Sequence, residues 1–229
     1  MTEEYIDYWQ LLASIDSIAA REGRNDEVRL IAVSKNQPVE KLLGLYKQGC
    51  RLFGESKVQE WVSKKEALPK DIEWHFIGTL QKNKVRKVVG EVSLIHSIDS
   101  LELAKKVAEV SVEKGVTSHI LLEVNTSMEG TKHGFTEEEV METYPQMQLL
   151  EGISVDGLMT IGPNTEDEGK IRRAFKNLRE IKEKLEKAGK RLPHLSMGMS
   201  HDFQIALEEG ATLIRVGTLL FGERTQKGG

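Results

Sequence analysis

Short apolar runs alternate along this chain with longer stretches in which apolar residues recur at helical spacing. The run Leu30–Val33 is apolar throughout, which is typical of a parallel strand covered on both faces. The segments with strand character are Arg29–Ser34, Arg51–Gly54, Glu73–Gly78, Ser93–Ile98, His119–Asn125, Ser154–Thr160, His194–Met197 and Thr212–Val216. Helix-like segments lie between them, so the pattern predicts parallel strands joined by helical crossovers.

Two helical segments carry the clearest pattern. The first, near the start of the chain, places on one face Tyr8, Leu11, Leu12, Ile15, Ile18 and Ala19. The second, after Thr165, repeats at helical spacing Ile171, Ala174, Phe175, Leu178, Ile181 and Leu185. Thr165 with Glu168, and Thr136 with Glu139, match the sequence pattern of a capping box, so we expect helices to begin at both places.

Eight strand–helix units in 229 residues predict an α/β protein, built as a single closed (β/α)8 barrel of the TIM type with an extra N-terminal helix. A doubly wound open sheet is the alternative, but no Gly-x-Gly-x-x-Gly motif follows the first strand. No low-complexity segment or Pro- or Gly-rich linker interrupts residues 1–229, so we expect one domain.

The composition narrows the class of protein. A charged content of 30% and a net charge of −4 give no reason to expect a nucleic-acid surface. Cys50 is the only cysteine, so the expected compartment is a reducing cytoplasm. The chain begins with acidic residues rather than a signal peptide, and no apolar stretch reaches membrane-spanning length, so we expect no membrane association.

The first chemical signal is Lys35, which follows the apolar run of the first strand. Strand alternation places it on the same face as Ile31 and Val33. Loss of hydration on such a face favours the neutral amine, which is the form that a Schiff-base lysine needs. The alternative is a lysine at a strand end that keeps its ammonium group in water.

Two short glycine-containing loops follow the seventh and eighth strands, where barrels often hold phosphate. In the first loop we expect Ser200 to cap the helix over His201–Glu209, with nearby amides facing an anion. In the second, Gly217 lets the backbone approach a phosphate closely, and Thr218 adds a hydroxyl donor. Ordinary strand–helix turns would also explain each loop taken alone.

Arg215 lies within the apolar eighth strand, where a guanidinium group without a partner is costly to desolvate. If its side chain points inward, it joins the ring of strand ends that contains Lys35; otherwise it lies on the surface. A lysine amine, a phosphate-binding pair of loops and an inward arginine together outline a pyridoxal 5′-phosphate (PLP) site.

The remaining polar residues give weaker signals. Asn125 either caps a loop or lines the same site, and Glu55 either begins a helix or contacts a ligand. Lys132, in a glycine-bounded loop, is either solvated or attracts anions at the rim. The histidines in or near strands are His75, His96 and His194. Because no His-x-His pair occurs, we expect these to be hydrogen-bonded core or rim groups, and we expect no metal.

Sequence blocks that cover nearly the whole chain carry a family resemblance: Ala32–Lys35, Phe53–Glu55, Val58–Glu60, His75–Gly78, Leu80–Lys84, Val124–Asn125, Gly157–Thr160, Ser196–Asp202 and Arg215–Gly222. On these blocks, the chain resembles the pyridoxal phosphate homeostasis proteins, which look like the barrel domain of alanine racemase standing alone. The resemblance implies a barrel of PLP fold type III that holds PLP as an aldimine on Lys35.

The resemblance also implies the cofactor-binding residues, which are Lys35, Ser56, Asn125, Met199, Ser200, Arg215, Gly217 and Thr218. Among them, Ser200, Gly217 and Thr218 would take the phosphate, with Met199 bordering it, and Arg215 would meet the pyridine nitrogen. The chain departs from the family pattern at three positions, with Ser56 where Asn is common, Gln37 where Lys is common and Thr79 where His is common.

These residues favour intracellular PLP homeostasis without robust catalytic turnover. Arginine only donates, so beside the pyridine nitrogen Arg215 would leave the ring a weak electron sink. Racemisation would then need a base on each face of the substrate, and only Lys35 is evident. The tyrosines, Tyr5, Tyr8, Tyr46 and Tyr144, lie in helical segments, and too few residues follow Thr218 for a second domain.

Two enzymes remain as alternatives: a slow PLP-dependent amino-acid racemase and a Schiff-base aldolase acting on a sugar phosphate. For the homeostasis protein, the expected partners are PLP and PLP-dependent apoenzymes that receive it. We expect no nucleic acid and no membrane partner, and a monomeric protein.

Overall fold

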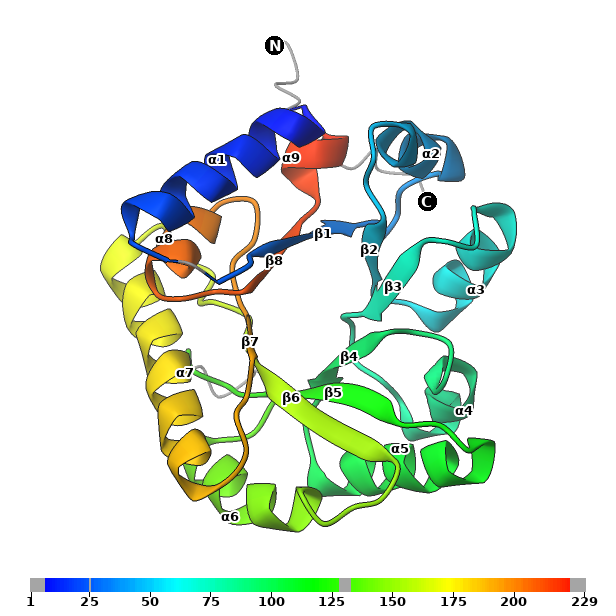
Figure 1. The fold of residues 1–229 in the computed structure, drawn as a ribbon, viewed down its shortest axis with the longest axis vertical. Helices are drawn as coiled ribbons and strands as arrows, with labels where there is room; N and C mark the ends of the chain where they lie inside the picture. The colour runs from blue at the N-terminus through cyan, green and yellow to red at the C-terminus, as the bar shows by residue number, and fades with distance from the viewer. Residues whose placement is uncertain (1–6, 25, 128–132, 223–229) are drawn as a thin grey trace.

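In the computed structural model, which describes residues 7–24, 26–127 and 133–222, eight parallel strands form a closed barrel (Figure 1). They are β1 (Arg29–Val33), β2 (Leu52–Glu55), β3 (Glu73–Phe76), β4 (Leu94–Ile98), β5 (Ser118–Glu123), β6 (Ile153–Met159), β7 (His194–Ser196) and β8 (Leu213–Val216). The strands pair in sequence order, and β8 closes the ring by pairing with β1 over Arg29–Ala32. The predicted barrel is confirmed, and the strand ends differ from prediction by only one or two residues.

The helices surround this ring (Figure 1). They are α1 (Tyr8–Arg21), α2 (Val39–Lys47), α3 (Val58–Ala67), α4 (Val85–Val88), α5 (Leu101–Lys114), α6 (Glu137–Met147), α7 (Glu168–Ala188), α8 (Phe203–Glu208) and α9 (Thr218–Phe221), with a 3-10 turn over Lys82–Lys84. Among these described helices, none combines the length and the apolar character needed to cross a bilayer.

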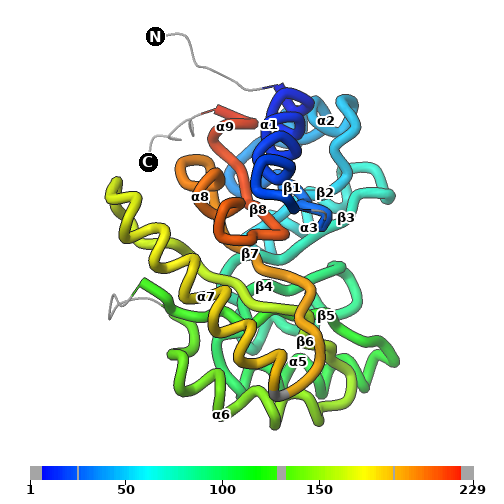
Figure 2. Tube along the Cα trace, turned by 60° about the vertical axis from the view of Figure 1, so that its left-hand side comes forward, coloured from blue at the N-terminus to red at the C-terminus, as the bar shows by residue number. Residues whose placement is uncertain are grey.

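The extra N-terminal helix α1 packs beside α8 and α9, as Figures 1 and 2 both show. Its buried face holds Leu11, Ile15, Ile18 and Ala19, while Tyr8 and Leu12 are partly buried. At its C-terminal end, Arg21 pairs with Glu208 at 3.0 Å. Arg24 donates to the Leu207 carbonyl at 3.0 Å. The first helix of the chain therefore covers the last strand–helix unit.

The predicted apolar face of α7 is confirmed, since all six of its apolar residues are buried. The predicted capping box at its start is wrong. The helix begins at Glu168, and Asp167 caps it by accepting the Lys170 amide at 3.0 Å. Thr165 instead accepts the Asp167 amide in a local turn. The capping box of Thr136 and Glu139, at the start of α6, is confirmed.

The core has two parts, one on each side of the strands. Between the strands and the helices lies a continuous apolar layer that includes Phe53, Phe175 and Phe221. Inside the barrel, a smaller apolar cluster consists of Ile31, Leu52, Leu94, Leu121, Met159 and Leu213. The remaining interior holds buried polar side chains, among them His75, His96, Ser196 and Arg215. The interior of the barrel is therefore apolar in one part and polar in another.

Candidate functional site

A cavity of about 300 Å³ opens where the strands end at their carboxyl termini. Its lining residues are Val33, Lys35, Ser56, Ile77, Met159, Ile161, Met199, Ser200, His201, Arg215, Gly217 and Thr218. Every predicted cofactor-binding residue except Asn125 is in this set. The sequence prediction did not assign a role to Val33, Ile77, Met159, Ile161 or His201, whose only signal is their position at or just after a strand end.

Lys35 extends from the turn after β1 into the cavity, on the same side of the strand as Val33. Ile31, two residues before Val33, belongs to the cluster inside the barrel, so the predicted face is confirmed. Lys35 is partly exposed rather than buried. The expected loss of hydration at its amine is therefore smaller than the sequence suggested.

A buried ion pair supports the backbone beside Lys35. Lys64 Nζ lies 2.6 Å from a Glu55 carboxylate oxygen, with the two side chains 7% and 0% exposed. The same ammonium group donates to the Ser34 carbonyl at 2.7 Å, and the Ser34 hydroxyl donates to Glu55 at 2.8 Å. Glu55 is therefore neither a helix start nor a ligand contact, but the buried partner of Lys64.

The backbone on the other side of Lys35 is held as well. The Asn36 amide donates to Glu60 at 2.9 Å, and Glu60 also pairs with Lys64 at 3.1 Å. Burial alone would raise the pKa of Glu60, but the Asn36 amide and the Lys64 and Lys57 ammonium groups outweigh it and lower that pKa to about 2. An ionised carboxylate thus anchors the left-handed residue Asn36, whose φ is 59°.

The sequence prediction missed Lys64 and Glu60, although a signal for Lys64 was present. Lys64 lies three residues after Trp61, which itself lies three residues after Val58, so helical periodicity places it on the packed face of α3. A lysine on a buried helix face needs a carboxylate partner.

Arg215 points inward, as one of the two sequence interpretations predicted. Its side chain donates to the Ser196 hydroxyl at 2.5 Å and to the Thr160 carbonyl at 2.8 Å. The residue is only 6% exposed. Burial lowers the pKa of Arg215 to about 10, against the opposing effect of Asp202 and Glu123, so the guanidinium group stays charged at neutral pH.

The loops after β7 and β8 meet at the cavity. The Arg215 amide donates to the Gly198 carbonyl at 3.0 Å, and the Leu219 amide approaches the Ser200 hydroxyl at 3.5 Å. The prediction that Ser200 caps the next helix is wrong, because α8 begins at Phe203 and Asp202 is the residue before it. Ser200 instead lies beside the start of α9 and brings its hydroxyl to the same side as Thr218.

Two glycines in these loops have different structural reasons. Gly198 has a φ of +93°, and a Cβ there would lie 2.6 Å from the Ala206 Cβ, so the fold itself requires glycine. Gly217 has no such constraint, because the nearest atoms to a Cβ there would be those of Val33, at 3.4 Å or more. A side chain at Gly217 is therefore compatible with the protein and would instead narrow the cavity.

Asn125 lies outside this cavity. It lines a neighbouring cavity of about 180 Å³, together with Thr79, Glu123, Val124, His133, Thr160 and Ile161. Its side-chain oxygen accepts from the Ser127 amide at 3.2 Å and hydroxyl at 3.0 Å, which confirms the loop-cap interpretation. Burial and the nearby Asp99 raise the pKa of Glu123 in this second cavity. Lys132, the candidate rim lysine, lies outside the described residues.

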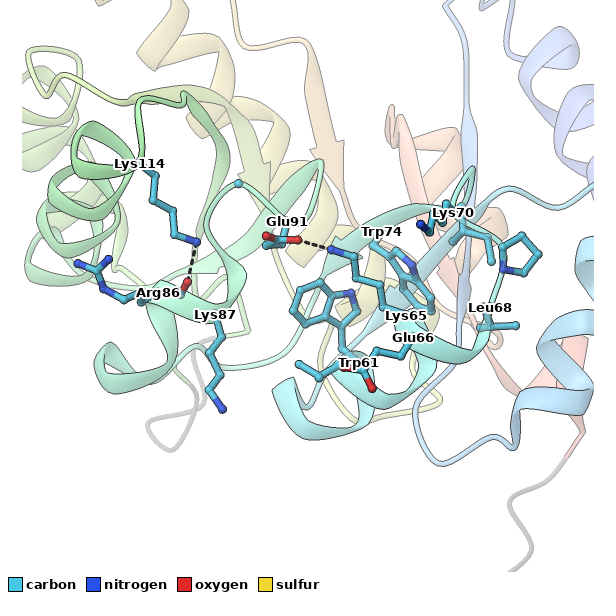
Figure 3. Close-up of a pocket in the computed structure, with 14 residues that line it drawn as sticks. Trp61, Lys65, Glu66, Leu68, Lys70, Trp74, Arg86, Lys87, Glu91 and Lys114 are labelled. Carbon is cyan, nitrogen blue, oxygen red and sulfur yellow. Dashed lines mark hydrogen bonds and ion pairs between the residues drawn. The ribbon is translucent and has the colours of Figure 1, made fainter.

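A larger cavity, of about 920 Å³, lies in the helical layer beside α3 and α4 (Figure 3). Three of the cationic side chains that line it already contact the protein. Lys65 pairs with Glu91, and Arg86 pairs with Glu113. Lys114 donates to the Arg86 carbonyl at 2.8 Å. Figure 3 shows the first and last of these contacts. These groups link the helices to one another, whereas the smaller cavity collects side chains from strand ends.

The family model called Alanine racemase, N-terminal domain matches residues 6–225. A relative from Aquifex aeolicus, named Pyridoxal phosphate homeostasis protein, is 43% identical over 218 residues, covering 94% of this chain and 96% of the relative. PipY of Synechococcus elongatus, whose structure has PLP bound, is 37% identical with a TM-score of 0.80, covering 91% of this chain and 100% of that chain. An alanine racemase from Clostridium difficile, 18% identical with a TM-score of 0.72, covers 94% of this chain and 56% of that chain, and shows a likeness of fold alone.

Proposed function

Because this chain belongs to the family of pyridoxal phosphate homeostasis proteins, we propose that it binds PLP in the cavity at Lys35 and acts in PLP homeostasis in the cytoplasm. The observation that carries the proposal is the convergence of three chemistries on one cavity. A lysine amine, the hydroxyl groups of two adjoining loops and a buried guanidinium group line the same 300 Å³.

The lining residues fit the cofactor part by part. Lys35 offers the primary amine for a Schiff base with the aldehyde. Ser200 and Thr218 offer hydroxyl groups to the phosphate, and the backbone at Gly217 has no side chain to keep it away. Arg215 offers a permanent donor to the pyridine nitrogen. Ser56 and Met199 line the remaining wall, where Met199 provides an apolar contact.

Bound PLP would supply an electron sink, and the surrounding residues decide how much of it is used. Arg215 donates a proton without giving it up, so it leaves the pyridine nitrogen unprotonated and the sink weak. The described tyrosines, Tyr8, Tyr46 and Tyr144, lie in α1, α2 and α6, and none of them lines the cavity. With one evident base, the site favours holding the cofactor over racemising an amino acid.

The proposal includes the partners of the protein. We propose that the protein binds PLP as a monomer. Lys35 is partly exposed at the cavity mouth, where a PLP-dependent apoenzyme could reach the cofactor. We therefore expect such apoenzymes to be the recipients of PLP.

Borohydride reduction of the PLP-loaded protein, followed by peptide mass analysis, tests the attachment site. The expected result is one reduced pyridoxyl group on Lys35, and none in Lys35→Ala. A Lys65→Ala variant, altered on the outer face of α3, should label as the wild type does. A label on another lysine would refute the assignment, and a protein that remains colourless with PLP would refute the function in favour of an aldolase.

Incubation of the loaded protein with L-alanine tests the absence of turnover. Chiral chromatography should detect no sustained racemisation. Turnover at rates ordinary for enzymes, about 1–10³ per second, that disappears in Lys35→Ala would establish a racemase instead.

A further inference from the structure

A chain of buried polar side chains crosses the barrel interior and ends at Arg215. From β8, Arg215 donates to the hydroxyl of Ser196 in β7 at 2.5 Å. The Ser196 hydroxyl lies 2.9 Å from Nδ1 of His96 in β4, and His96 Nε2 lies 3.0 Å from Nδ1 of His75 in β3. His75 Nε2 lies 3.1 Å from a carboxylate oxygen of Glu73, at the start of β3.

Every connecting group in this chain is enclosed. Ser196 and His96 are fully buried, and His75 is 1% exposed. Both ring nitrogens of each histidine therefore face another member of the chain rather than solvent. A neutral imidazole has one donor and one acceptor nitrogen. If one ring nitrogen donates a hydrogen bond, the other must therefore accept one.

The carboxylate of Glu73 sets the direction of the chain, because an ionised carboxylate only accepts. Arg29 pairs with Glu73 at 2.5 Å. The hydrogen bond from His75, together with Arg29, lowers the pKa of Glu73 to about 2 although partial burial opposes this. Glu73 is therefore ionised at neutral pH, and His75 must carry its proton on Nε2.

The remaining bonds follow in order. If His75 is neutral, its Nδ1 accepts, so His96 Nε2 donates; His96 Nδ1 then accepts, so the Ser196 hydroxyl donates. Burial lowers the pKa of His75, with Arg29 adding to this effect and Glu73 opposing it. Burial lowers the pKa of His96 well below its usual value, and the nearby His75, Arg215 and His194 lower it as well. Both rings are accordingly neutral at neutral pH.

We propose that Glu73, His75, His96 and Ser196 are positioning residues: they form a hydrogen-bond chain of one fixed direction that orients the guanidinium group of Arg215 at the cavity floor. The carboxylate of Glu73 can only accept, and this end of the chain sets the direction. The guanidinium group of Arg215 can only donate, and it fits that direction because the Ser196 oxygen keeps a lone pair to accept its hydrogen bond. With the Ser196 proton committed to His96, its oxygen is free to accept from Arg215. Together with the bond to Thr160, this fixes the plane of the guanidinium group.

The histidine tautomers test the direction of the chain in protein without added PLP. Long-range proton–nitrogen correlation spectra of nitrogen-15-labelled protein distinguish protonated from unprotonated ring nitrogens, and His75→Gln and His96→Gln variants assign the signals. The expected result at neutral pH is a protonated Nε2 and an unprotonated Nδ1 in both rings. A protonated Nδ1 in either ring would overturn the proposal.

Two substitutions at Glu73 separate a directing role from a structural one. Glu73→Gln keeps an oxygen that accepts from His75 but loses the charge that pairs with Arg29, whereas Glu73→Leu loses both. The proposal predicts that the glutamine variant keeps the tautomers of both histidines and that the leucine variant does not. If the two variants behave alike, Glu73 does not set the direction and the proposal is wrong.

The effect on the cavity rests on the proposed function and is measured separately. Ser196→Ala cuts the chain beside Arg215, and we expect about 2–10-fold weaker PLP binding, as for the loss of one ordinary hydrogen bond. Ser118→Ala, which removes a buried hydroxyl that bonds Ser111 away from the cavity, should bind PLP as the wild type does. Unchanged affinity in Ser196→Ala would refute the positioning role. A wild-type protein that binds no PLP would refute the proposed function, while the tautomers still decide the direction of the chain.

Discussion

The Lys64→Met variant removes the ammonium group that supports the backbone beside Lys35, and we expect a large loss of stability. Lys64 Nζ lies 2.6 Å from Glu55, and the two side chains are almost completely buried. Removing one partner of a buried ion pair typically costs about 3–5 kcal/mol, because the other charge is left without compensation. Methionine is of similar length, so the loss reflects the missing ammonium group rather than an empty volume.

Glu55 keeps part of its compensation in this variant, which places the expected loss near the lower end of that range. Its carboxylate still accepts from the Ser34 hydroxyl at 2.8 Å and from the Ser56 amide at 2.7 Å. A second change, Glu55→Gln, removes the uncompensated charge. The double variant is therefore expected to recover about 1 kcal/mol relative to Lys64→Met alone.

Urea denaturation followed by tryptophan fluorescence measures these changes as free energies of unfolding. Lys65→Met is the matched control, since this neighbouring lysine pairs with Glu91 where the side chains are 39% and 44% exposed. A surface pair of this kind contributes less than about 1 kcal/mol. If Lys64→Met costs no more than Lys65→Met, the buried pair does not stabilise this segment and the reasoning is refuted.

Three further predictions concern the cavity and the buried histidines. In calorimetric titration, pyridoxal without its phosphate should bind far more weakly than PLP, because hydrogen bonds to a charged group, each worth about 1.5–3 kcal/mol, are lost. Equal affinities for the two compounds would refute the assignment of phosphate binding to the loops after β7 and β8. Gly217→Ala should weaken PLP binding with little change in the urea midpoint of unfolding. The control Gly44→Ala, at an open position in α2, should leave PLP binding unchanged. A Gly217→Ala protein with normal affinity for PLP would contradict the cavity assignment. Burial lowers the pKa of His75 and His96, so below about pH 6.5 the unfolded chain binds more protons than the folded one. The free energy of unfolding should therefore fall as pH falls, by up to about 1.4 kcal/mol per pH unit for each histidine. A constant free energy of unfolding from about pH 6.5 to 5 would contradict this.

The barrel was predictable because its signals are local. Wholly apolar runs and amphipathic stretches alternate with the period of strands and helices, and each strand fixes which of its residues face inward. The convergence of Lys35, Ser200 and Thr218 then followed from the rule that barrel sites lie at strand ends. The family blocks pointed to the same site, and the family itself is confirmed.

The errors arose where several side chains compete for one local role. Both Thr165 and Asp167 are helix-capping residue types, and the start of α7 is decided by the tertiary path of the chain before it. Asn125 was open to two interpretations, and residue type alone does not separate them. Its side-chain oxygen accepts from Ser127 and the residue lines the second cavity, so a contact with the cofactor stays a prediction.

Partners far apart in the sequence were beyond prediction. His96 and Ser196 are 100 residues apart, and no spacing pattern indicates that they touch. The expectation of hydrogen-bonded histidines is confirmed for His75 and His96. It fails for Nδ1 of His194, which is buried and has no hydrogen-bond partner among the described residues.

The pairing of β8 with β1 makes the cavity depend on both ends of the barrel being in place. Lys35 comes from the first strand, and Gly217 and Thr218 follow the last, so no partial ring contains the site. α1 likewise contacts α8, which is synthesised only after the first seven strands. Contacts between segments so far apart in the sequence form slowly, and until they form the apolar face of α1 is exposed to solvent. Ligand binding during refolding would therefore report ring closure itself, and a ligand that binds only the closed ring shifts the folding equilibrium toward it.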